Sequence, residues 1–356
     1  MKKVTALADH LSAPLLWLVA LANLLFIAAF VATLLLLGGQ ARAETEIPAC
    51  KGADMLPEMA KDDAAGFARM QADAAATPNG VGLLWKVEKA GAEPSFLFGT
   101  MHMTDPRVVT LPTSAQTAFD AASTVVIETT DVLDQSAMTA SLMASPELMM
   151  FTDGTTLTSL MSPDDAKVVE EGLAKRGIPA QAVERMKPWM LTSMLAVPAC
   201  ELARKAAGAP VLDVNLAEQA KVAGKEIAGL ETAKSQIEAM ASLPIEFHVE
   251  GLVETMKLGD RIDDVIETMI EIYKTEATGL FVPFMRVASP DSASGDGYAV
   301  FEEKMITSRN VGMAKNSEPF LDKGKAFIAV GAMHLPGDQG LVELLRKDGY
   351  TVTRVD

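Results

Sequence analysis

Two stretches of this sequence follow one pattern, FLFGTMH at residues 96–102 and IAVGAMH at residues 328–334. In each, an apolar run typical of a buried strand leads into Gly-x-Met-His. A Pro-containing loop, a helical segment and another apolar strand follow both times. Because ligands of open α/β sheets gather beyond the carboxyl ends of strands, His102 and His334 are expected to converge if the two strands are neighbours.

The repeated unit predicts an α/β fold in which a strand, a loop, a helix and a second strand occur near each end of the chain. Apolar or β-branched segments indicate strands at 81–87, 95–98, 124–127, 226–230, 326–330 and 351–355. Helices are expected at 58–76, across most of 135–205 and at 298–314. The expected architecture is therefore an internally pseudo-symmetric mixed sheet flanked by helices, with a helical middle insertion.

Composition excludes two broad classes of protein. The chain has 356 residues, of which 49% are hydrophobic and 22% charged, a balance typical of globular proteins and not of wholesale disorder. It carries 31 Lys and Arg against 47 Asp and Glu, a formal net charge of −16. We therefore expect no nucleic-acid partner, because binding phosphates requires a basic surface.

Residues 1–43 have the features of an export segment. Lys2 and Lys3 precede an uncharged apolar run at 11–37, and Ala41-Arg42-Ala43 supplies a small-x-small cleavage site. The run is longer than the roughly 7–15 residues of most signal cores and exceeds the roughly 20 residues that cross a bilayer. Two interpretations stay open, a signal peptide removed after Ala43 and an uncleaved inner-membrane anchor at 11–37.

Both interpretations place the residues after 44 on the exported, periplasmic side, with membrane contact only through the first segment. We divide that exported part into an N-terminal surface segment, 44–80, and one α/β domain, 81–356, since no long linker interrupts it. It contains the chain's two cysteines, Cys50 and Cys200. In an oxidising compartment the pair is a disulfide candidate; the alternative is two unpaired thiols.

The two repeated histidines are candidate metal ligands. A hydrolytic metal site typically has three protein ligands and a water, so a carboxylate is needed beside His102 and His334. Glu128 directly follows the strand at 124–127 and is the first choice as ligand or general base. Arg309 offers a rigid fork of donors for a substrate or oxyanion. On spacing alone, Glu128 could equally cap a helix and Arg309 could be a surface charge.

Further motifs lie between and beyond the histidines: VVIE at 125–128, DGTTL at 153–157, KPW at 187–189, GLET at 229–232 followed by Gln236, SRN at 308–310 and VGAMHLPG at 330–337. With these motifs, residues 80–356 resemble the TraB/GumN family, which includes the animal TIKI proteins. The resemblance implies an internally pseudo-symmetric α/β fold similar to that of erythromycin esterases and ChaN-like haem-binding proteins.

The resemblance also implies an activity. TIKI members look like metal-dependent proteases that act on peptide N-termini and favour Mn²⁺ or Co²⁺; we keep Zn²⁺ as a third candidate. Carried over, the family's metal ligands are His102, His334 and Glu128. Its catalytic residues are Glu128, Arg309 and Asn310, of which Arg309 and Asn310 match the family's Arg-Asn pair.

Three functions remain open at this point. The first is an exported metal-dependent hydrolase, peptidase-like, with a peptide or small-molecule substrate. The second is an envelope protein that binds haem or a small ligand through the same histidines, non-covalently because no Cys-x-x-Cys-His motif is present. The third is a non-catalytic envelope interaction protein. A serine hydrolase is disfavoured because no Gly-x-Ser-x-Gly motif occurs.

Overall fold

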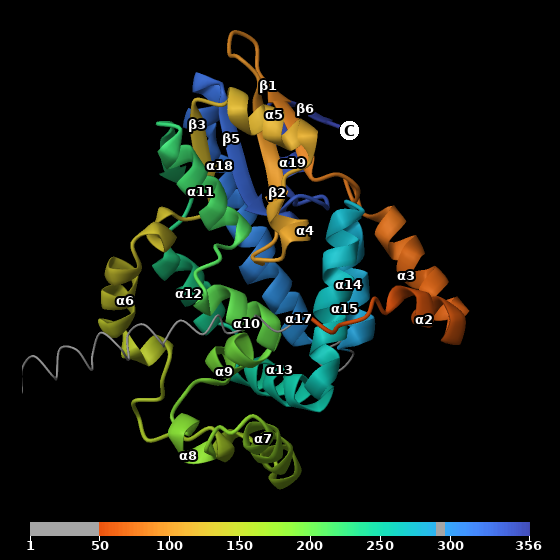
Figure 1. Cartoon of the computed structure of the whole chain (residues 1–356), viewed down its shortest axis with the longest axis vertical. Helices are drawn as coiled ribbons and strands as arrows, with labels where there is room; N and C mark the ends of the chain where they lie inside the picture. Colours follow the sequence, from red (N-terminus) through yellow and green to blue (C-terminus); the bar gives the residue numbers. More distant parts are fainter. Residues whose placement is uncertain (1–49, 290–295) are drawn as a thin grey trace, which may run out of the picture. The chain divides into compact units, whose positions relative to one another are not determined.

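The computed structural model describes residues 50–289 and 296–356 (Figure 1). The predicted export segment at 1–43, with its apolar run at 11–37, lies outside the described residues. No helix in the described ranges is long and apolar enough to cross a membrane.

Six strands form one mixed sheet in the order β4-β3-β5-β2-β1-β6. The strands β2, β3, β4 and β5 run parallel, and β1 is antiparallel to both of its neighbours. Their bounds are β1 Leu84–Glu88, β2 Ser95–Thr100, β3 Thr124–Ile127, β4 Glu226–Gly229, β5 Ala326–Gly331 and β6 Thr351–Arg354. The predicted mixed α/β fold is confirmed. The first strand starts later than predicted because Gly82, at φ +122°, turns the backbone and donates its N–H to Glu276 O.

The two repeated strands are direct neighbours in the centre of the sheet. The parallel register of β2 and β5 aligns Gly99 with Val330 and Thr100 with Gly331, so both histidine loops leave the same edge. A side chain at Gly99 would come within 2.8 Å of the Leu335 side chain. Glycine is needed here because the second histidine loop packs directly against the first.

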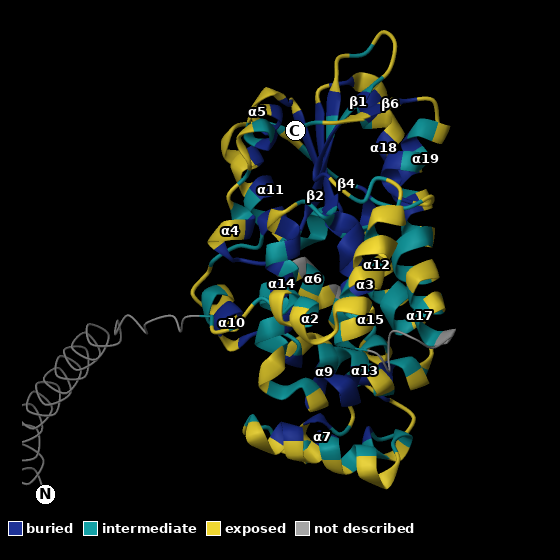
Figure 2. Cartoon of the chain, turned by 90° about the vertical axis from the view of Figure 1, so that its right-hand side faces the viewer, coloured by how far each residue is buried: buried dark blue, intermediate teal, exposed yellow. Residues whose placement is uncertain are grey.

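Each face of the sheet has its own hydrophobic core, because successive strand residues point to opposite faces. Phe98 and Phe327 pack with α5 and α11, whereas Leu97 and Ile328 pack with α18 and α19. Figure 2 shows the buried sheet edge-on between these two pairs of helices. Their bounds are α5 Thr113–Ala121, α11 Leu212–Val222, α18 Ser308–Lys323 and α19 Leu341–Lys347.

The prediction of one continuous helix at 58–76 is wrong. It is two helices, α2 (Leu56–Asp62) and α3 (Ala64–Ala76), with a break at Asp63. The Asp63 carboxylate accepts a hydrogen bond from Gly66 N–H at 2.8 Å and so caps α3. Met70 of α3 is buried in the same core cluster as α14 (Ile262–Lys274) and α15 (Phe281–Ala288).

The middle of the chain is helical, as predicted, and has a core of its own. Leu173, Leu191 and Leu252 form a third buried cluster, separate from the two against the sheet. The elements of this region are η1 Thr130–Leu133, α6 Gln135–Met143, η2 Pro146–Leu148, η3 Thr158–Leu160, α7 Pro163–Lys175, α8 Ala180–Val183, α9 Pro188–Leu195, α10 Ala199–Ala206, α12 Ala233–Ala241 and α13 Ile245–Leu258. Cys50 and Cys200 form a disulfide with a Cα–Cα distance of 5.2 Å, which joins the start of the described chain to α10.

The last long helical stretch extends beyond the predicted end at residue 314. It consists of α17 (Asp296–Phe301), a π-helical turn η6 (Glu302–Thr307) and α18 (Ser308–Lys323). The helix continues through Pro319 because Met313 and Leu321 bury one continuous face against the sheet. Tertiary packing thus overrides the local preference of proline to end a helix.

Candidate functional site

His102 lies in the loop that follows β2, and a buried aspartate holds its ring. Its Nδ1 lies 2.7 Å from Asp213 Oδ2, and the other oxygen of Asp213 accepts the Thr100 hydroxyl at 2.7 Å. Since a carboxylate only accepts, Nδ1 carries the proton. The negative charge of Asp213 raises the pKa of His102 to about 9. Its side chain remains 61% exposed, so Nε2 is accessible.

His334 ends the short turn η7 (Ala332–His334), which follows β5, and is buried. Its Nδ1 lies 2.6 Å from Asn310 Oδ1, while the amide of Asn310 donates to the Gln339 carbonyl at 2.8 Å. This second bond fixes the amide orientation, so His334 donates from Nδ1. Burial lowers the pKa of His334 to about 4, and the imidazole is therefore neutral at pH 7.

Glu128 follows β3 and is buried between the two histidine motifs. Its Oε1 accepts the Gly331 N–H at 2.7 Å and lies 3.9 Å from His334 Nε2. Its Oε2 accepts from Arg309 Nη2 at 2.7 Å and from Gln236 at 2.9 Å. Burial opposes ionisation, but the charges of the two histidines and Arg309 lower the pKa of Glu128 to about 2. The carboxylate is thus ionised at neutral pH.

Arg309 lies on α18 directly after the π-helical turn and bridges two carboxylates. Its Nη2 is 2.7 Å from both Glu128 Oε2 and Glu231 Oε2, and only 12% of its side chain is exposed. Its Nη1 donates to the Met305 carbonyl within the turn at 3.2 Å. π-helical turns are frequent at functional sites. Here the turn is the backbone segment that supports the buried arginine.

Contacts join Glu128 to Arg309 and His334, and His334 to Asn310. His102 contacts Asp213 instead and lies near enough to Glu128 and His334 for their charges to influence one another. The five residues that the sequence selects come from the ends of three neighbouring parallel strands and from α18. Asn310 acts behind His334 as a positioning residue. Within residues 50–289 and 296–356 no three His, Cys, Asp or Glu side chains are already arranged as a metal-binding cluster, since Glu128 is turned onto Gly331 and Arg309.

Comparison with known proteins assigns the chain to a family. The sequence profile of the TraB/PrgY/gumN family matches residues 83–354. The chain belongs to this family. The predicted resemblance is thereby confirmed.

Curated relatives of this TraB/PrgY/gumN chain are similar at low identity. "Metalloprotease TIKI2" of Danio rerio is 24% identical over 319 residues, which covers 76% of this chain and 60% of the relative. "Metalloprotease TIKI1" of Homo sapiens is 23% identical over 324 residues, with 76% and 61% covered. The chain thus spans about 60% of the length of these relatives. No solved structure gives a significant match.

Three polar residues of the TraB/PrgY/gumN site were not assigned roles from sequence. Glu231 and Gln236 belong to the family motifs, and their contacts to Arg309 and Glu128 become visible only in the structure. Asp213 is 111 positions from His102, and no motif marks it. The sequence feature that could have indicated its role is that Asp213 is an acidic residue on the same buried helix face as Leu212 and Leu216.

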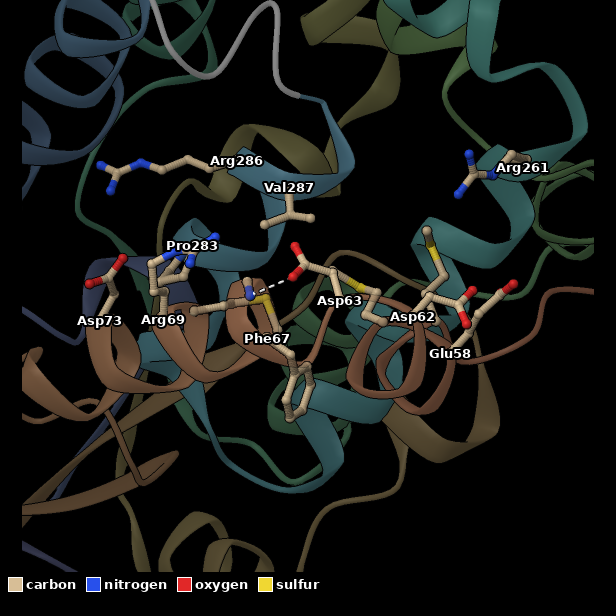
Figure 3. Close-up of a pocket in the computed structure, with 14 residues that line it drawn as sticks. Glu58, Asp62, Asp63, Phe67, Arg69, Asp73, Arg261, Pro283, Arg286 and Val287 are labelled. Carbon is tan, nitrogen blue, oxygen red and sulfur yellow. Dashed lines mark hydrogen bonds between the residues drawn. The ribbon is translucent and has the colours of Figure 1, made fainter.

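A cavity of about 630 Å³ between α2, α3 and α15 is lined by none of these site residues. Figure 3 shows acidic and basic side chains around it, including Asp63, Arg69 and Arg286. The Asp63 carboxylate facing this cavity is already used to cap α3. The cavity therefore contributes nothing to the histidine site of this TraB/PrgY/gumN chain.

Asp213→Asn is expected to lower the pKa of His102 from about 9 toward its ordinary value of 6.5, because the charge that stabilises the imidazolium is removed. In the native protein this ion pair stabilises the fold fully below pH 6.5, and the contribution is lost as the pH rises through 9. The measurement is the NMR chemical shift of the His102 Cε1–H proton as a function of pH. Asp120→Asn, at an exposed position, is the control. An unchanged His102 titration in Asp213→Asn would contradict the conclusion that Asp213 raises the pKa of His102.

Proposed function

We propose that this chain is a metal-dependent hydrolase with peptide substrates. One observation carries the proposal: each of two converging imidazoles is held at Nδ1 by a buried acceptor, Asp213 or Asn310. Metal-binding histidines in proteins almost always donate the second ring N–H in this way, which fixes the ring and frees the other nitrogen. The similarity to the metalloproteases TIKI1 and TIKI2 supports the same class of activity.

The chemistry of three side chains suits a divalent metal, although in the described residues they are not arranged as a metal-binding cluster. His102 Nε2, His334 Nε2 and the ionised Glu128 would provide a nitrogen–oxygen donor set of the kind that suits Zn²⁺, Mn²⁺ or Co²⁺. When bound, such a metal would supply a water of lowered pKa and polarise a carbonyl oxygen. His334 is neutral already, whereas His102 must release its proton before it can bind a metal.

Arg309 and Glu231 have a supporting role in this proposal. All of the Arg309 contacts are to protein acceptors, so the arginine holds Glu128 ionised and oriented instead of presenting a free fork to substrate. Glu231 in turn fixes the guanidinium from the end of β4. An ionised, well-positioned Glu128 would serve either as a metal ligand or as the group that accepts a proton from the attacking water.

We further propose that the residues after 44 act outside the cytoplasm. The basic start, the apolar run at 11–37 and the small-x-small site at 41–43 support export. The disulfide between Cys50 and Cys200 supports an oxidising compartment.

Purified protein stripped with a chelator is expected to cleave no peptide in a random-peptide library, and to gain cleavage on addition of Mn²⁺, Co²⁺ or Zn²⁺. Glu128→Gln should lower the metal-restored rate by about 10²–10⁴-fold, the usual contribution of a general base. Cleavage products are counted by mass spectrometry. Glu93→Gln, at an exposed ion pair, is the control.

Two outcomes would contradict the proposal. A Soret band that shifts on addition of haem, with no peptide cleavage under any metal, would favour the haem-binding alternative. Metal binding without turnover of any peptide would favour a non-catalytic interaction protein.

A further inference from the structure

We propose that α10, fixed by the Cys50–Cys200 disulfide, is the element that positions the His102 loop, and that Glu201 is its positioning residue. The consequence for metal binding rests on the proposed function. The geometry of the loop itself does not depend on it.

Glu201 is fully buried, and both of its oxygens are used by one residue of the loop. Oε1 accepts the Thr104 backbone N–H and Oε2 accepts the Thr104 hydroxyl, each at 2.7 Å. Thr104 is two positions beyond His102. Burying a carboxylate is costly unless it is hydrogen-bonded and paired. Arg204 and Lys205 lie 3.8 and 3.7 Å from the Glu201 carboxylate and provide the pairing.

A second contact joins α10 to the same loop. Arg204 Nη1 lies 3.2 Å from Oδ2 of the buried Asp105. Asp105 also accepts hydrogen bonds from Arg107, and Arg107 continues to Glu267 on α14. The segment that follows His102 is thus held on one side by α10 and on the other by α14.

The disulfide joins α10 to the segment that lies on α14, so the two sides that hold the loop are also linked to each other. Cys200 immediately precedes Glu201, and its partner Cys50 begins a segment that is fixed on α14. Ala53 N–H donates to Asp264 at 2.8 Å and Met55 N–H donates to Thr268 at 2.8 Å. A side chain at position 52 would collide with the Asp263 carbonyl, so the segment lies directly on the helix.

α10 depends on these anchors. It has eight residues and begins after Pro198, and helices shorter than about 12–15 residues are marginal without tertiary contacts. Met103, between His102 and Thr104, is buried and borders the same small gap as the disulfide. Loss of the crosslink therefore frees the helix that carries Glu201, and the loop loses its support.

The test compares Glu201→Ala, Glu201→Gln and the double variant Cys50→Ser/Cys200→Ser with the native chain. The first readout is hydrogen exchange of the amides at 101–105, and the second is affinity for Co²⁺ by competition with a chelator. We expect faster exchange at Thr104 in Glu201→Ala and in the double variant, with metal affinity about 10–100-fold weaker. Glu201→Gln should recover most of both, because an amide can still pair with Thr104.

Leu202→Ala is the matched control, since Leu202 lies on the same helix and is 47% exposed; it should change neither readout. If Glu201→Ala does not fold, the comparison of Cys50→Ser/Cys200→Ser with the native chain tests the positioning role. Unchanged exchange at 101–105 in folded variants would overturn the positioning role while leaving the metal proposal intact. If the amides at 101–105 exchange faster in the variants than in the native chain, but the native chain itself binds no Co²⁺, the positioning role is supported and the metal proposal is rejected.

Discussion

His102→Ala and His334→Ala are each expected to remove a near-stoichiometric metal from the protein. Each change deletes one of the two imidazoles whose Nδ1 is held and whose Nε2 is free. With a ligand gone, the remaining nitrogen and one carboxylate fall short of the three protein ligands that a catalytic site typically supplies. The measurement is metal content by plasma mass spectrometry after loading and desalting.

Both variants should lose stability. His334 is buried, and its removal leaves Asn310 Oδ1 without its donor, which costs about 1–3 kcal/mol in the free energy of unfolding. His102→Ala likewise leaves Oδ2 of the buried Asp213 without its donor, so a cost of the same order is expected there. Loss of metal therefore counts as loss of a ligand only where chemical denaturation shows that the variant is folded.

His248→Ala is the matched control for a buried histidine. Its Nε2 already lies 3.1 Å from the Met240 carbonyl within the helical region, far from the repeated motifs in sequence. This variant should lose stability and keep its metal. Retention of metal in both His102→Ala and His334→Ala would remove the assigned role from the two motifs.

Arg309→Met is expected to cause the largest loss of stability in the site, about 3–5 kcal/mol in the free energy of unfolding. Methionine preserves much of the side-chain volume but removes the charge between Glu128 and Glu231, whose side chains are 9% and 11% exposed. Two buried carboxylates then face each other without the cation that lies between them. Chemical denaturation at pH 7 measures the loss.

The pH dependence gives a second check on this variant. In the native protein the pKa of Glu128 is lowered from 4.5 to about 2, so its favourable contribution is present above 4.5 and is lost as the pH falls toward 2. The difference between Arg309→Met and the native protein should therefore be largest at neutral pH and shrink on acidification.

Two further variants test whether the stability loss in Arg309→Met comes from the two buried carboxylates. Lys323→Met breaks an ion pair with Glu226 whose partners are 61% and 53% exposed, and should change stability by less than about 1 kcal/mol. Arg309→Met/Glu231→Gln should recover part of the loss, because one of the opposed charges is gone. Equal stability of Arg309→Met and the native protein would show that the bridge is not needed to hold the carboxylates.

The repeated motif made the centre of the fold predictable from sequence. A strand followed by Gly-x-Met-His, present twice, predicted that the two histidine loops meet if the two strands are neighbours, and the structure shows that β2 and β5 are neighbours. Glu128 could be placed because it immediately follows a short β-branched strand. Local pattern was sufficient for these residues because parallel strands bring their carboxyl ends to one edge.

The residues that hold the histidines could not be found in this way. Asp213 and Glu201 are separated from their partners by 111 and 97 positions, and both occupy helices with an ordinary polar pattern. Only tertiary packing decides which helical carboxylate is buried. The same is true of the break at Asp63 and the continuation of α18 through Pro319, where a cap and a buried face outweigh local propensity.

The central pairing of β2 with β5 also determines when this site can form. The Ser95 hydroxyl oxygen accepts the Ala326 N–H across 231 positions of the chain. Closing so long a loop is entropically costly, and folds dominated by such distant contacts form slowly. The helices of the middle region can form earlier from local contacts. We therefore expect the two imidazoles to meet late in folding, after the local helices, so that any ligand shared between them binds a largely folded protein.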